Sequence, residues 1–309
     1  MKFDVAITNY KRPTMVKDAV KSCLNQGQLL NRIIVVDDAS EDNTAEVIKA
    51  INDQRIVFSQ RTENGGIAAA RRDAFELSDA DWLISMDSDH ELLPGAIEGM
   101  AKLLASAKET VDILGARYLW DTGGVTPLNI PDGIIGYRER ITLSAQKDGI
   151  GADYLCALSK RIRQTVRWEP LRSGLPDTLF QLDIAKTGKA IFTPDILAFE
   201  KTGGDYGWTR GSVEQRWLRR CQDAPDGLKA FELILKRHGY SLRQWGKNKL
   251  SSLYRQGAFY ALLSDQRIQA LRWLLSDIKM GDISINIVGL VLLSMLPKNI
   301  LKGIYFLRG

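Results

Sequence analysis

Two apolar runs that end in acidic residues constrain this sequence more than any other feature. Arg32–Asp38 reads RIIVVDD, and Trp82–Asp87 reads WLISMD before Ser88 and Asp89. A short run that is apolar on both faces is typical of a central strand in a parallel sheet with helices on both sides. Because ligands bind at the carboxyl ends of such strands, we expect both acidic groups to lie at a functional edge.

The order of elements predicts the same fold class. Strands are expected at Phe3–Thr8 and Ile56–Gln60 as well, with helical patterns between them, in units of roughly 25 residues. After residue 110 the pattern is less regular. There we expect strands at Ile113–Tyr118, Gly136–Thr142, Ala152–Ser159 and Ala190–Phe199, a helix at Pro176–Thr187, and mostly helix from Trp208. The prediction is an α/β fold with a mostly parallel central sheet and a helical C-terminal extension.

Composition and local signals exclude several classes. The 309 residues are 45% hydrophobic and 26% charged, which indicates a folded globular chain. Three scattered cysteines and two histidines argue against a disulfide framework and a structural zinc site. Charged first residues and the lack of a long apolar run lead us to expect a cytoplasmic chain without a signal peptide or membrane span. Asn64-Gly65-Gly66 matches neither the dinucleotide fingerprint nor the P-loop.

The Asp87-Ser88-Asp89 motif is the sharpest chemical signal. Two acids one residue apart, just past a buried strand, place both carboxylates in one cleft, where leaving them unpaired is costly. A divalent cation that also binds a diphosphate would offset that cost, because hard cations take carboxylate and phosphate oxygens together. The alternative is a solvated acidic loop that caps the helix beginning near Pro94.

Two further groups point to a nucleotide. Asp37-Asp38 ends the second strand, where an Asp can accept hydrogen bonds from a base or a ribose. The alternatives are an N-cap cluster, or a magnesium site in a phospho-receiver domain, although the late strand-end lysine of a receiver cannot be placed. Arg71, in the helix after the Gly-rich turn, reaches toward a nucleotide or is a surface arginine.

Taken together, these residues resemble the inverting glycosyltransferases of family 2, which have the A-type nucleotide-sugar-binding fold. The matching segments are VAITNYKRP, IIVVDDASEDNTAEVI, ENGGIAAARRDA and WLISMDSDHELLPGAI, over residues 3–97. CALSKRIRQTVRW and LPDTLFQLDIAKTGKAIFTPD match more weakly. The resemblance implies a catalytic domain at 1–205, with a nucleotide-sugar-binding half (1–110) and an acceptor-binding half (111–205). Residues 206–309 would form a basic helical extension.

The resemblance also implies roles for individual residues. The base pocket would be lined by Thr8, Asn9 and Tyr10, and Asp38 would accept from the base. Arg71 would flank the nucleotide, Asp87 would contact the ribose, Asp89 would bind the metal, and Asp177 would be the general base.

This sequence departs from the family pattern at three places. Pro176 replaces the usual acid before Asp177, Lys186 stands where an arginine is frequent, and FEKTGGD lacks the histidine that sometimes completes the metal shell. The third metal ligand therefore stays open, and His90 is expected either to support the motif or to be exposed.

The resulting functional prediction is a hexosyl-transferring, inverting enzyme that depends on Mn²⁺ or Mg²⁺. It would move sugar from a nucleoside diphosphate, UDP before dTDP or GDP, to a glycan or lipid-linked saccharide in bacterial surface polysaccharide synthesis. Two alternatives are a sugar nucleotidyltransferase, and a nucleotide-sensing or nucleic-acid-binding protein on the same fold, although no nucleic-acid motif is present beyond charge. A homo-oligomer is compatible with the sequence.

Charge and hydropathy single out the C-terminal third. Residues 1–200 carry 24 basic and 29 acidic side chains, whereas residues 201–309 carry 18 and 8. An acidic front half suits a cation site, and a basic rear suits an anionic surface. Residues 283–308 combine an apolar stretch with alternating basic and apolar residues, which is typical of a helix that lies at the membrane surface. The alternative is a helix packed on the catalytic domain or at a dimer seam.

Overall fold

The computed structural model describes residues 1–146, 154–201 and 212–280, together with residues 291, 294 and 302. The chain divides into two units. The first comprises Met1–Pro170 and Phe180–Gly204, and the second comprises Leu171–Leu179 and Asp205–Gly309. The first unit holds the sheet, and the second is helical.

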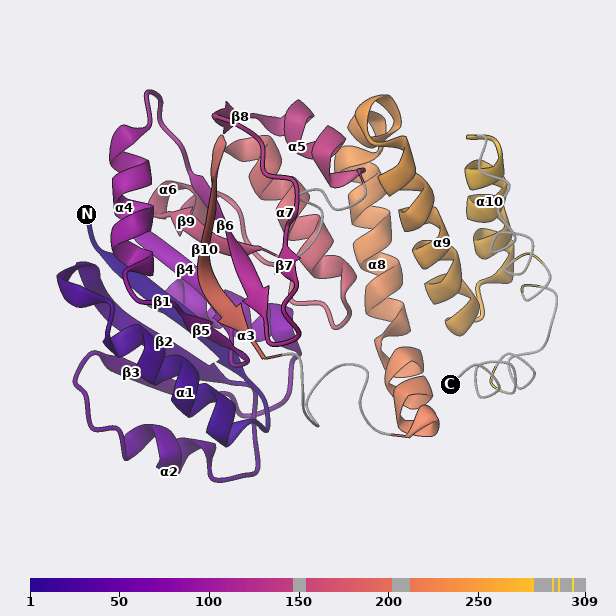
Figure 1. Ribbon diagram of the computed structural model, residues 1–309. Helices are drawn as coiled ribbons and strands as arrows, with labels where there is room; N and C mark the ends of the chain where they lie inside the picture. The colour runs from indigo at the N-terminus through magenta and orange to yellow at the C-terminus, as the bar shows by residue number, and fades with distance from the viewer. Residues whose placement is uncertain (147–153, 202–211, 281–290, 292–293, 295–301, 303–309) are drawn as a thin grey trace. The chain divides into compact units, whose positions relative to one another are not determined.

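A mixed sheet forms the centre of the first unit (Figure 1). Its strands lie in the order β3 (Ile56–Gln60), β2 (Leu30–Asp37), β1 (Phe3–Asn9), β4 (Trp82–Asp87), β9 (Leu155–Ser159), β6 (Ile113–Trp120), β10 (Ala190–Glu200) and β5 (His90–Leu92). The short strands β7 (Val125–Thr126) and β8 (Ile134–Ile135) pair with β6 and β10. Within this path only β9 and β5 oppose the other described strands in direction. The predicted mostly parallel α/β fold is confirmed.

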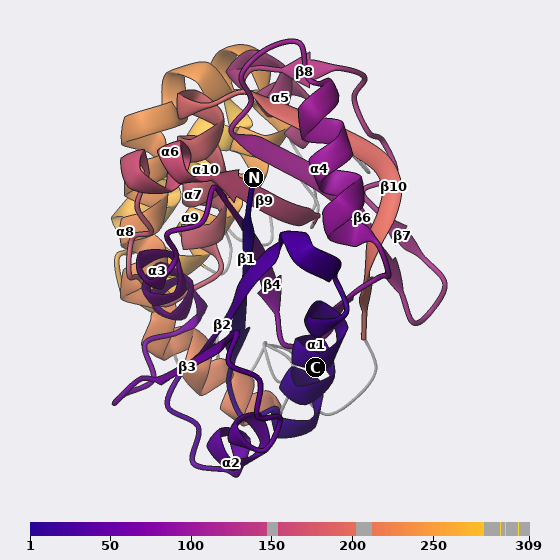
Figure 2. The same cartoon turned by 90° about the vertical axis from the view of Figure 1, so that its left-hand side faces the viewer.

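Helices cover both faces of the sheet (Figure 2). One face packs against α1 (Pro13–Leu24) and α4 (Ala96–Ser106), and the other against α3 (Ile67–Leu77), α6 (Lys160–Thr165) and the second half of α7 (Leu175–Thr187). The smaller helices of this unit are η1 (Gly27–Leu29), α2 (Thr44–Lys49) and α5 (Tyr137–Ser144). This layering explains why the central strands are apolar along their whole length.

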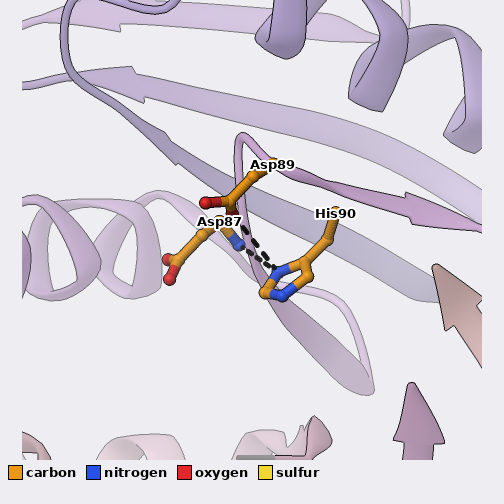
Figure 3. A group of neighbouring side chains, drawn as sticks. All are labelled: Asp87, Asp89 and His90. Atoms are coloured by element: carbon orange, nitrogen blue, oxygen red, sulfur yellow. Dashed lines mark hydrogen bonds and ion pairs between the residues drawn. The ribbon is translucent and has the colours of Figure 1, made fainter. Parts of the chain in front are cut away.

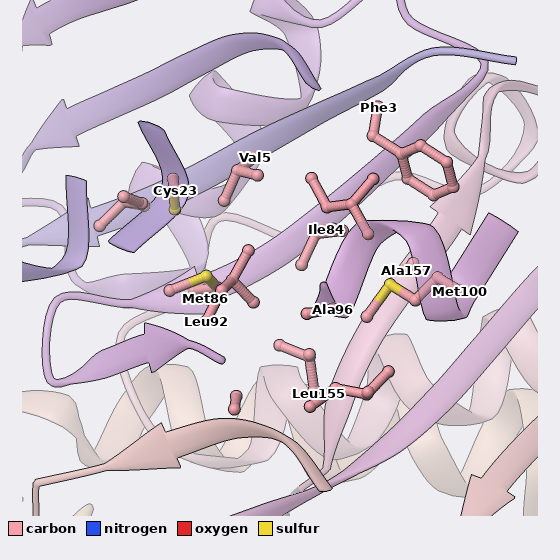
Figure 4. Close-up of a cluster of buried hydrophobic side chains, with 14 of the residues drawn as sticks. Phe3, Val5, Cys23, Ile84, Met86, Leu92, Ala96, Met100, Leu155 and Ala157 are labelled. Carbon is pink, nitrogen blue, oxygen red and sulfur yellow. The ribbon is translucent and has the colours of Figure 1, made fainter. Parts of the chain in front are cut away.

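Alternate residues of the central strands enter the two cores. In β1, Val5 and Ile7 belong to the core beneath α1 and α4, and Ala6 belongs to the core on the opposite face. Figure 4 shows the first core, where Met86 and Ile84 of β4 lie with Cys23 of α1 and Met100 of α4. Burial of one such large side chain stabilises the fold by about 1.5–3 kcal/mol, so the acidic strand ends are held on a rigid support.

The expectation of a strand at Gly136–Thr142 is wrong. That stretch forms α5, and only Ile134–Ile135 before it pairs as a strand. The guanidinium of Arg140 is buried and donates to the hydroxyl of Tyr154 at 2.8 Å and to the Gln181 amide oxygen at 3.1 Å. These tertiary contacts favour a helix in a segment whose Ile and Thr favour a strand. The strand predicted at Ala152–Ser159 is described from Leu155.

The second unit contains α8 (Val213–Trp245), α9 (Lys247–Leu263) and α10 (Arg267–Ile278). Phe231 of α8 packs edge-on against Trp273 of α10, with ring centroids 4.6 Å apart. Gly257 of α9 permits close approach, because a Cβ there would lie 2.1 Å from the Phe231 ring. Within the described part of the chain, no helix has the length and apolar character that crossing a bilayer requires. The segment at 283–308 lies outside the described residues except for positions 291, 294 and 302.

Candidate active site

The parallel pairing of β1 and β4 builds the first part of the site. Their register places Thr8 beside Asp87 at the carboxyl ends of the two strands. The Thr8 hydroxyl donates to Asp87 Oδ1 at 2.9 Å. Arg71, in the second turn of α3, donates from one guanidinium nitrogen to both oxygens of Asp87, at 3.0 and 3.1 Å. Three residues predicted for the nucleotide site therefore lie in contact.

Asp89 lies on the turn between β4 and β5. Its Oδ2 accepts a hydrogen bond from the Arg12 guanidinium at 2.7 Å, and its Oδ1 lies 3.9 Å from Nδ1 of His90. Figure 3 shows Asp89 and His90 side by side, with Asp87 at the start of the turn. Each carboxylate of the motif thus contacts an arginine of its own: Asp87 contacts Arg71 in α3, and Asp89 contacts Arg12 just before α1.

His90 holds the backbone of the turn between β4 and β5. Its Nδ1 accepts the backbone N–H of Asp87 at 3.1 Å, and its Nε2 lies 3.6 Å from Oε2 of Glu200. The imidazole stacks on Tyr118, with ring centroids 4.5 Å apart and an interplanar angle of 11°. Of the two expectations for His90, support is the one that the structure shows, because the residue is buried.

Charge and burial act in opposite directions on the titrating groups. Burial alone would raise the pKa of Asp87, but the charges of Arg71 and His90 and the Thr8 hydrogen bond outweigh it, so the pKa is lowered. Burial and the neighbouring charge of Asp87 raise the pKa of Asp89. Burial would lower the pKa of His90, but the hydrogen bond with Glu200 and the charges of Asp87 and Asp89 raise it. The site therefore favours an added positive charge at Asp89.

The two acids at the end of β2 have separate functions. The Asp37 side chain is fully buried and accepts hydrogen bonds from Asn9 Nδ2 at 2.8 Å, from the Ser40 N–H and hydroxyl, and from Gln60 Nε2 at 3.1 Å. Asp37 therefore braces the ends of three strands. Asn9, predicted in the base pocket, uses its amide group for this brace.

We predict that Asp37→Ala destabilises the fold by about 3 kcal/mol or more, because it leaves several buried donors without their acceptor. Urea unfolding followed by circular dichroism measures the change. Glu41→Ala, which removes a carboxylate in a 3.7 Å surface pair with Lys11, is the matched control and should cost under about 0.5 kcal/mol. Equal midpoints for the two variants would contradict the bracing role.

Asp38 anchors the Gly-rich turn. Its two carboxylate oxygens accept the backbone N–H groups of Gly65 at 2.9 Å and Gly66 at 2.8 Å, and its Oδ1 lies 3.0 Å from Nε of Arg61. Gly66 has φ +83°, a conformation that glycine adopts without strain, and α3 begins at the next residue. Asp38 thus sets the position of the helix that carries Arg71.

Asp87, Asp89 and His90 form a group whose ligand atoms all lie within 4.8 Å of one another. Two carboxylates are the ligand type that Mg²⁺ and Mn²⁺ take, and an imidazole is compatible with Mn²⁺. Burial and the charge of Asp87 both raise the pKa of Asp89, and a cation bound beside it would offset both effects. The donor set therefore fits one divalent cation.

A comparison with protein families identifies the family of this chain. The profile described as Glycosyl transferase family 2 matches residues 4–162, which contain β1 to β9 and the Asp87-Ser88-Asp89 motif. The chain belongs to glycosyltransferase family 2. The residues that match the family 2 profile all lie in the first unit.

Curated relatives are bacterial glycosyltransferases. The undecaprenyl-phosphate 4-deoxy-4-formamido-L-arabinose transferase of Proteus mirabilis is 31% identical over 108 residues, 34% of this chain and 32% of the relative. The putative teichuronic acid biosynthesis glycosyltransferase TuaG of Bacillus subtilis is 27% identical over 127 residues, 40% of this chain and 50% of the relative. The matched region of this family 2 chain thus spans a third to a half of these relatives.

Solved structures share the fold across most of the chain. TarS of S. aureus, residues 1–349 in complex with UDP-GlcNAc, has a TM-score of 0.58 at 15% identity and covers 93% of this chain and 95% of its own. The mannosyltransferase PcManGT from Pyrobaculum calidifontis, in complex with GDP-Man and Mn²⁺, has a TM-score of 0.55 at 15% identity and covers 99% and 83%. These likenesses establish the A-type glycosyltransferase fold.

Two further predicted site residues are Tyr10 and Asp177. Tyr10 follows β1 with 42% of its surface exposed. Asp177 lies in the first turn of α7, in the part of that helix that belongs to the second unit. Sequence reasoning assigned no role to Arg12 or Glu200, which contact Asp89 and His90. Both stand in segments quoted from the sequence, Arg12 in VAITNYKRP and Glu200 in FEKTGGD, but neither was singled out there.

Proposed function

We propose that this family 2 chain is a metal-dependent inverting glycosyltransferase. It moves a hexose from a nucleoside diphosphate, preferentially UDP, to a hydroxyl of a glycan or lipid-linked saccharide in bacterial surface polysaccharide synthesis. The observation that carries the proposal is the grouping of Asp87, Asp89 and His90 at the carboxyl end of β4, beside Thr8 and Arg71. The UDP-GlcNAc bound by TarS and the polysaccharide pathways named for the relatives support it.

The metal site in this proposal consists of Asp89, assisted by Asp87 and His90, and takes Mn²⁺ or Mg²⁺. When bound, the cation supplies positive charge against the diphosphate leaving group. The Mn²⁺ complex of PcManGT supports this assignment. Arg71 balances Asp87 in the absence of the cation, and His90 holds the backbone of the turn so that both carboxylates keep their place.

The nucleotide occupies the strand ends in this proposal. Thr8, Asn9 and Tyr10 line the base, Asp38 accepts from it, and Asp87 contacts the ribose beside Arg71. Tyr10 is the exposed member of this set, so it is free to close over a base without a cost in core packing. Asp37 holds Nδ2 of Asn9, whereas Oδ1 of Asn9 makes no hydrogen bond in the described structure.

Asp177 is the general base in this proposal. The acceptor hydroxyl must lose its proton as it attacks the anomeric carbon, and a carboxylate within hydrogen-bond reach accelerates such a step by about 10²–10⁴-fold. A single displacement inverts the anomeric centre, so an α-linked donor gives a β-linked product. No covalent nucleophile is required.

Thermal unfolding with UDP, dTDP and GDP, each with Mn²⁺, Mg²⁺ or EDTA, tests the proposal. A ligand present at 100 times its Kd stabilises the native state by about 2.7 kcal/mol. For a chain of this length, that raises Tm by roughly 2–4 °C. The proposal requires a shift with UDP that disappears in EDTA. Equal Tm values with every nucleotide, or a shift that persists in EDTA, would count against it.

We predict that Arg12→Gln tightens Mn²⁺ binding in the absence of nucleotide, on the order of 3- to 10-fold, because the guanidinium competes with the cation for Asp89. Calorimetric titration with MnCl₂ measures the affinity. Arg55→Gln, which breaks a 2.8 Å pair with Asp53 elsewhere in the sheet unit, is the matched control and should leave the affinity unchanged. Weaker Mn²⁺ binding by Arg12→Gln would show that Asp89 is not the ligand.

A further inference from the structure

A cavity lies at the amino-terminal end of β4, the end opposite the acidic motif. It has a volume of about 470 Å³ and is lined by residues from the last turns of α3, from α6 and from the segment that ends at Trp168. The backbone N–H of Lys160 donates to the carbonyl of Asp81, the residue before β4, which places the cavity at the amino-terminal edge of the sheet. This edge lies about 17 Å, the length of β4, from Asp87. Its volume suits a small molecule.

The lining carries an excess of positive charge. It contains four cationic side chains and only one acidic side chain, Glu76; the cations are Arg72, Lys160, Arg163 and Arg167. Arg72 is paired with Asp73, at 2.6 Å. Lys160 and Arg167 are exposed, and in the described parts of the chain neither forms an ion pair. These two side chains therefore leave uncompensated positive charge at the mouth of the cavity.

Two buried donors of the lining have no acceptor. Nε1 of Trp168 and Nε of Arg163 are shielded from solvent and make no hydrogen bond in the described structure, on side chains that are 5% and 9% exposed. The terminal nitrogens of Arg163 donate to the carbonyls of Ser78 at 3.1 Å and Ala80 at 2.6 Å. A buried donor without an acceptor costs free energy, which an entering acceptor recovers as the side chains shift toward it.

We propose that this cavity, the Arg163–Trp168 pocket, binds a small phosphate-bearing ligand. A phosphate group offers several acceptor oxygens and up to two negative charges, which match the unpaired donors and the excess cations. A guanidinium fork suits phosphate oxygens in particular. Phe75 and Trp168 form an apolar wall for the rest of the ligand. The proposal does not depend on the transferase activity.

Trp168 also connects the pocket to the active site. Its ring stacks on Phe180 of α7, with centroids 3.9 Å apart and an interplanar angle of 9°. The guanidinium carbon of Arg71 lies 5.4 Å from the centroid of the same ring. Arg71 also donates hydrogen bonds to Asp87, so a ligand that moves Trp168 would alter the surroundings of a side chain that contacts the acidic motif.

Calorimetric titration with inorganic pyrophosphate in EDTA tests the pocket. Without a metal, the carboxylates of the acidic motif repel the probe, so the Arg163–Trp168 pocket is the expected site. The double variant Lys160→Gln/Arg167→Gln and the single variant Trp168→Phe, which removes the indole donor and keeps an aromatic ring, should each weaken binding by about tenfold or more. Lys102→Gln/Lys108→Gln removes the same charge from exposed positions in and after α4 and should bind as the wild type does. Arg163 is not substituted, because it donates to the carbonyl of Ser78 at the end of α3.

Vesicles distinguish a soluble phosphate from a lipid headgroup. Co-sedimentation with phosphatidylglycerol vesicles, against phosphatidylcholine vesicles, is measured for the same variants. The proposal is supported if binding of either probe is lost in both pocket variants and kept in the control. The probe that binds shows whether the phosphate belongs to a soluble molecule or to a lipid headgroup. The proposal is overturned if neither probe binds, or if the pocket variants bind both probes as tightly as the control.

Discussion

Asp89→Ala is expected to lower sugar transfer at least about 1,000-fold, because a metal at a developing charge contributes several kcal/mol to the transition state. Asp87 is already held by Thr8 and Arg71, whereas Asp89 meets Arg12 and has a raised pKa. Asp89 is therefore the carboxylate with the most to gain from a cation. The stabilisation of the chain by UDP with Mn²⁺ should disappear in the same variant.

Transfer assays and thermal unfolding on the purified variant measure both effects. Glu232→Ala, which removes an exposed acid on α8, is the control and should keep transfer within about twofold of the wild type. The Asp89→Ala protein should unfold as cooperatively as the wild type, since its side chain lies outside both cores. Transfer by Asp89→Ala at the rate of the control would contradict a role for a metal at Asp89 in sugar transfer.

Asp177→Asn is expected to lower transfer about 10²–10⁴-fold while leaving the UDP affinity unchanged. The amide is almost the same size as the carboxylate but cannot accept a proton from the acceptor hydroxyl. A loss in turnover without a loss in donor binding is the signature of a base that acts only in the chemical step. Steady-state kinetics with calorimetric titration of UDP separates the two quantities.

Asp183→Asn makes the same change six residues further along α7 and is the matched control. It should keep most of the wild-type turnover. Wild-type transfer by Asp177→Asn would sink the assignment of the base. A chain that binds UDP and transfers no sugar even as the wild type would instead favour the nucleotide-sensing alternative on the same fold.

The part of the fold that holds the site follows from local sequence. β1, β2 and β4 are apolar on both faces because helices cover both faces, and the acids at their ends fall at one edge because the strands are parallel. The contact of Thr8 with Asp87 follows from that register. The sequence pattern therefore predicts the part of the site that the ends of β1, β2 and β4 form.

Long-range contacts explain what the sequence could not predict. β5 is three residues long and exists because it pairs with the end of β10, more than a hundred residues later. That pairing brings Glu200 to His90, and no local pattern around His90 indicates such a partner. α5 is a similar case, because one guanidinium nitrogen of its buried Arg140 donates to Tyr154 and Gln181, 14 and 41 residues later in the chain.

The configuration of the released sugar tests the central claim most directly. UDP-α-glucose and UDP-α-GlcNAc are incubated with the chain and Mn²⁺, and the anomeric protons are followed by NMR before the free sugar equilibrates, with acceptor saccharides added in parallel. We expect that UDP is released only with the metal and that the first sugar product is β-configured. An α-configured first product, or equal release in EDTA or by Asp89→Ala, would contradict a metal-dependent inverting transferase.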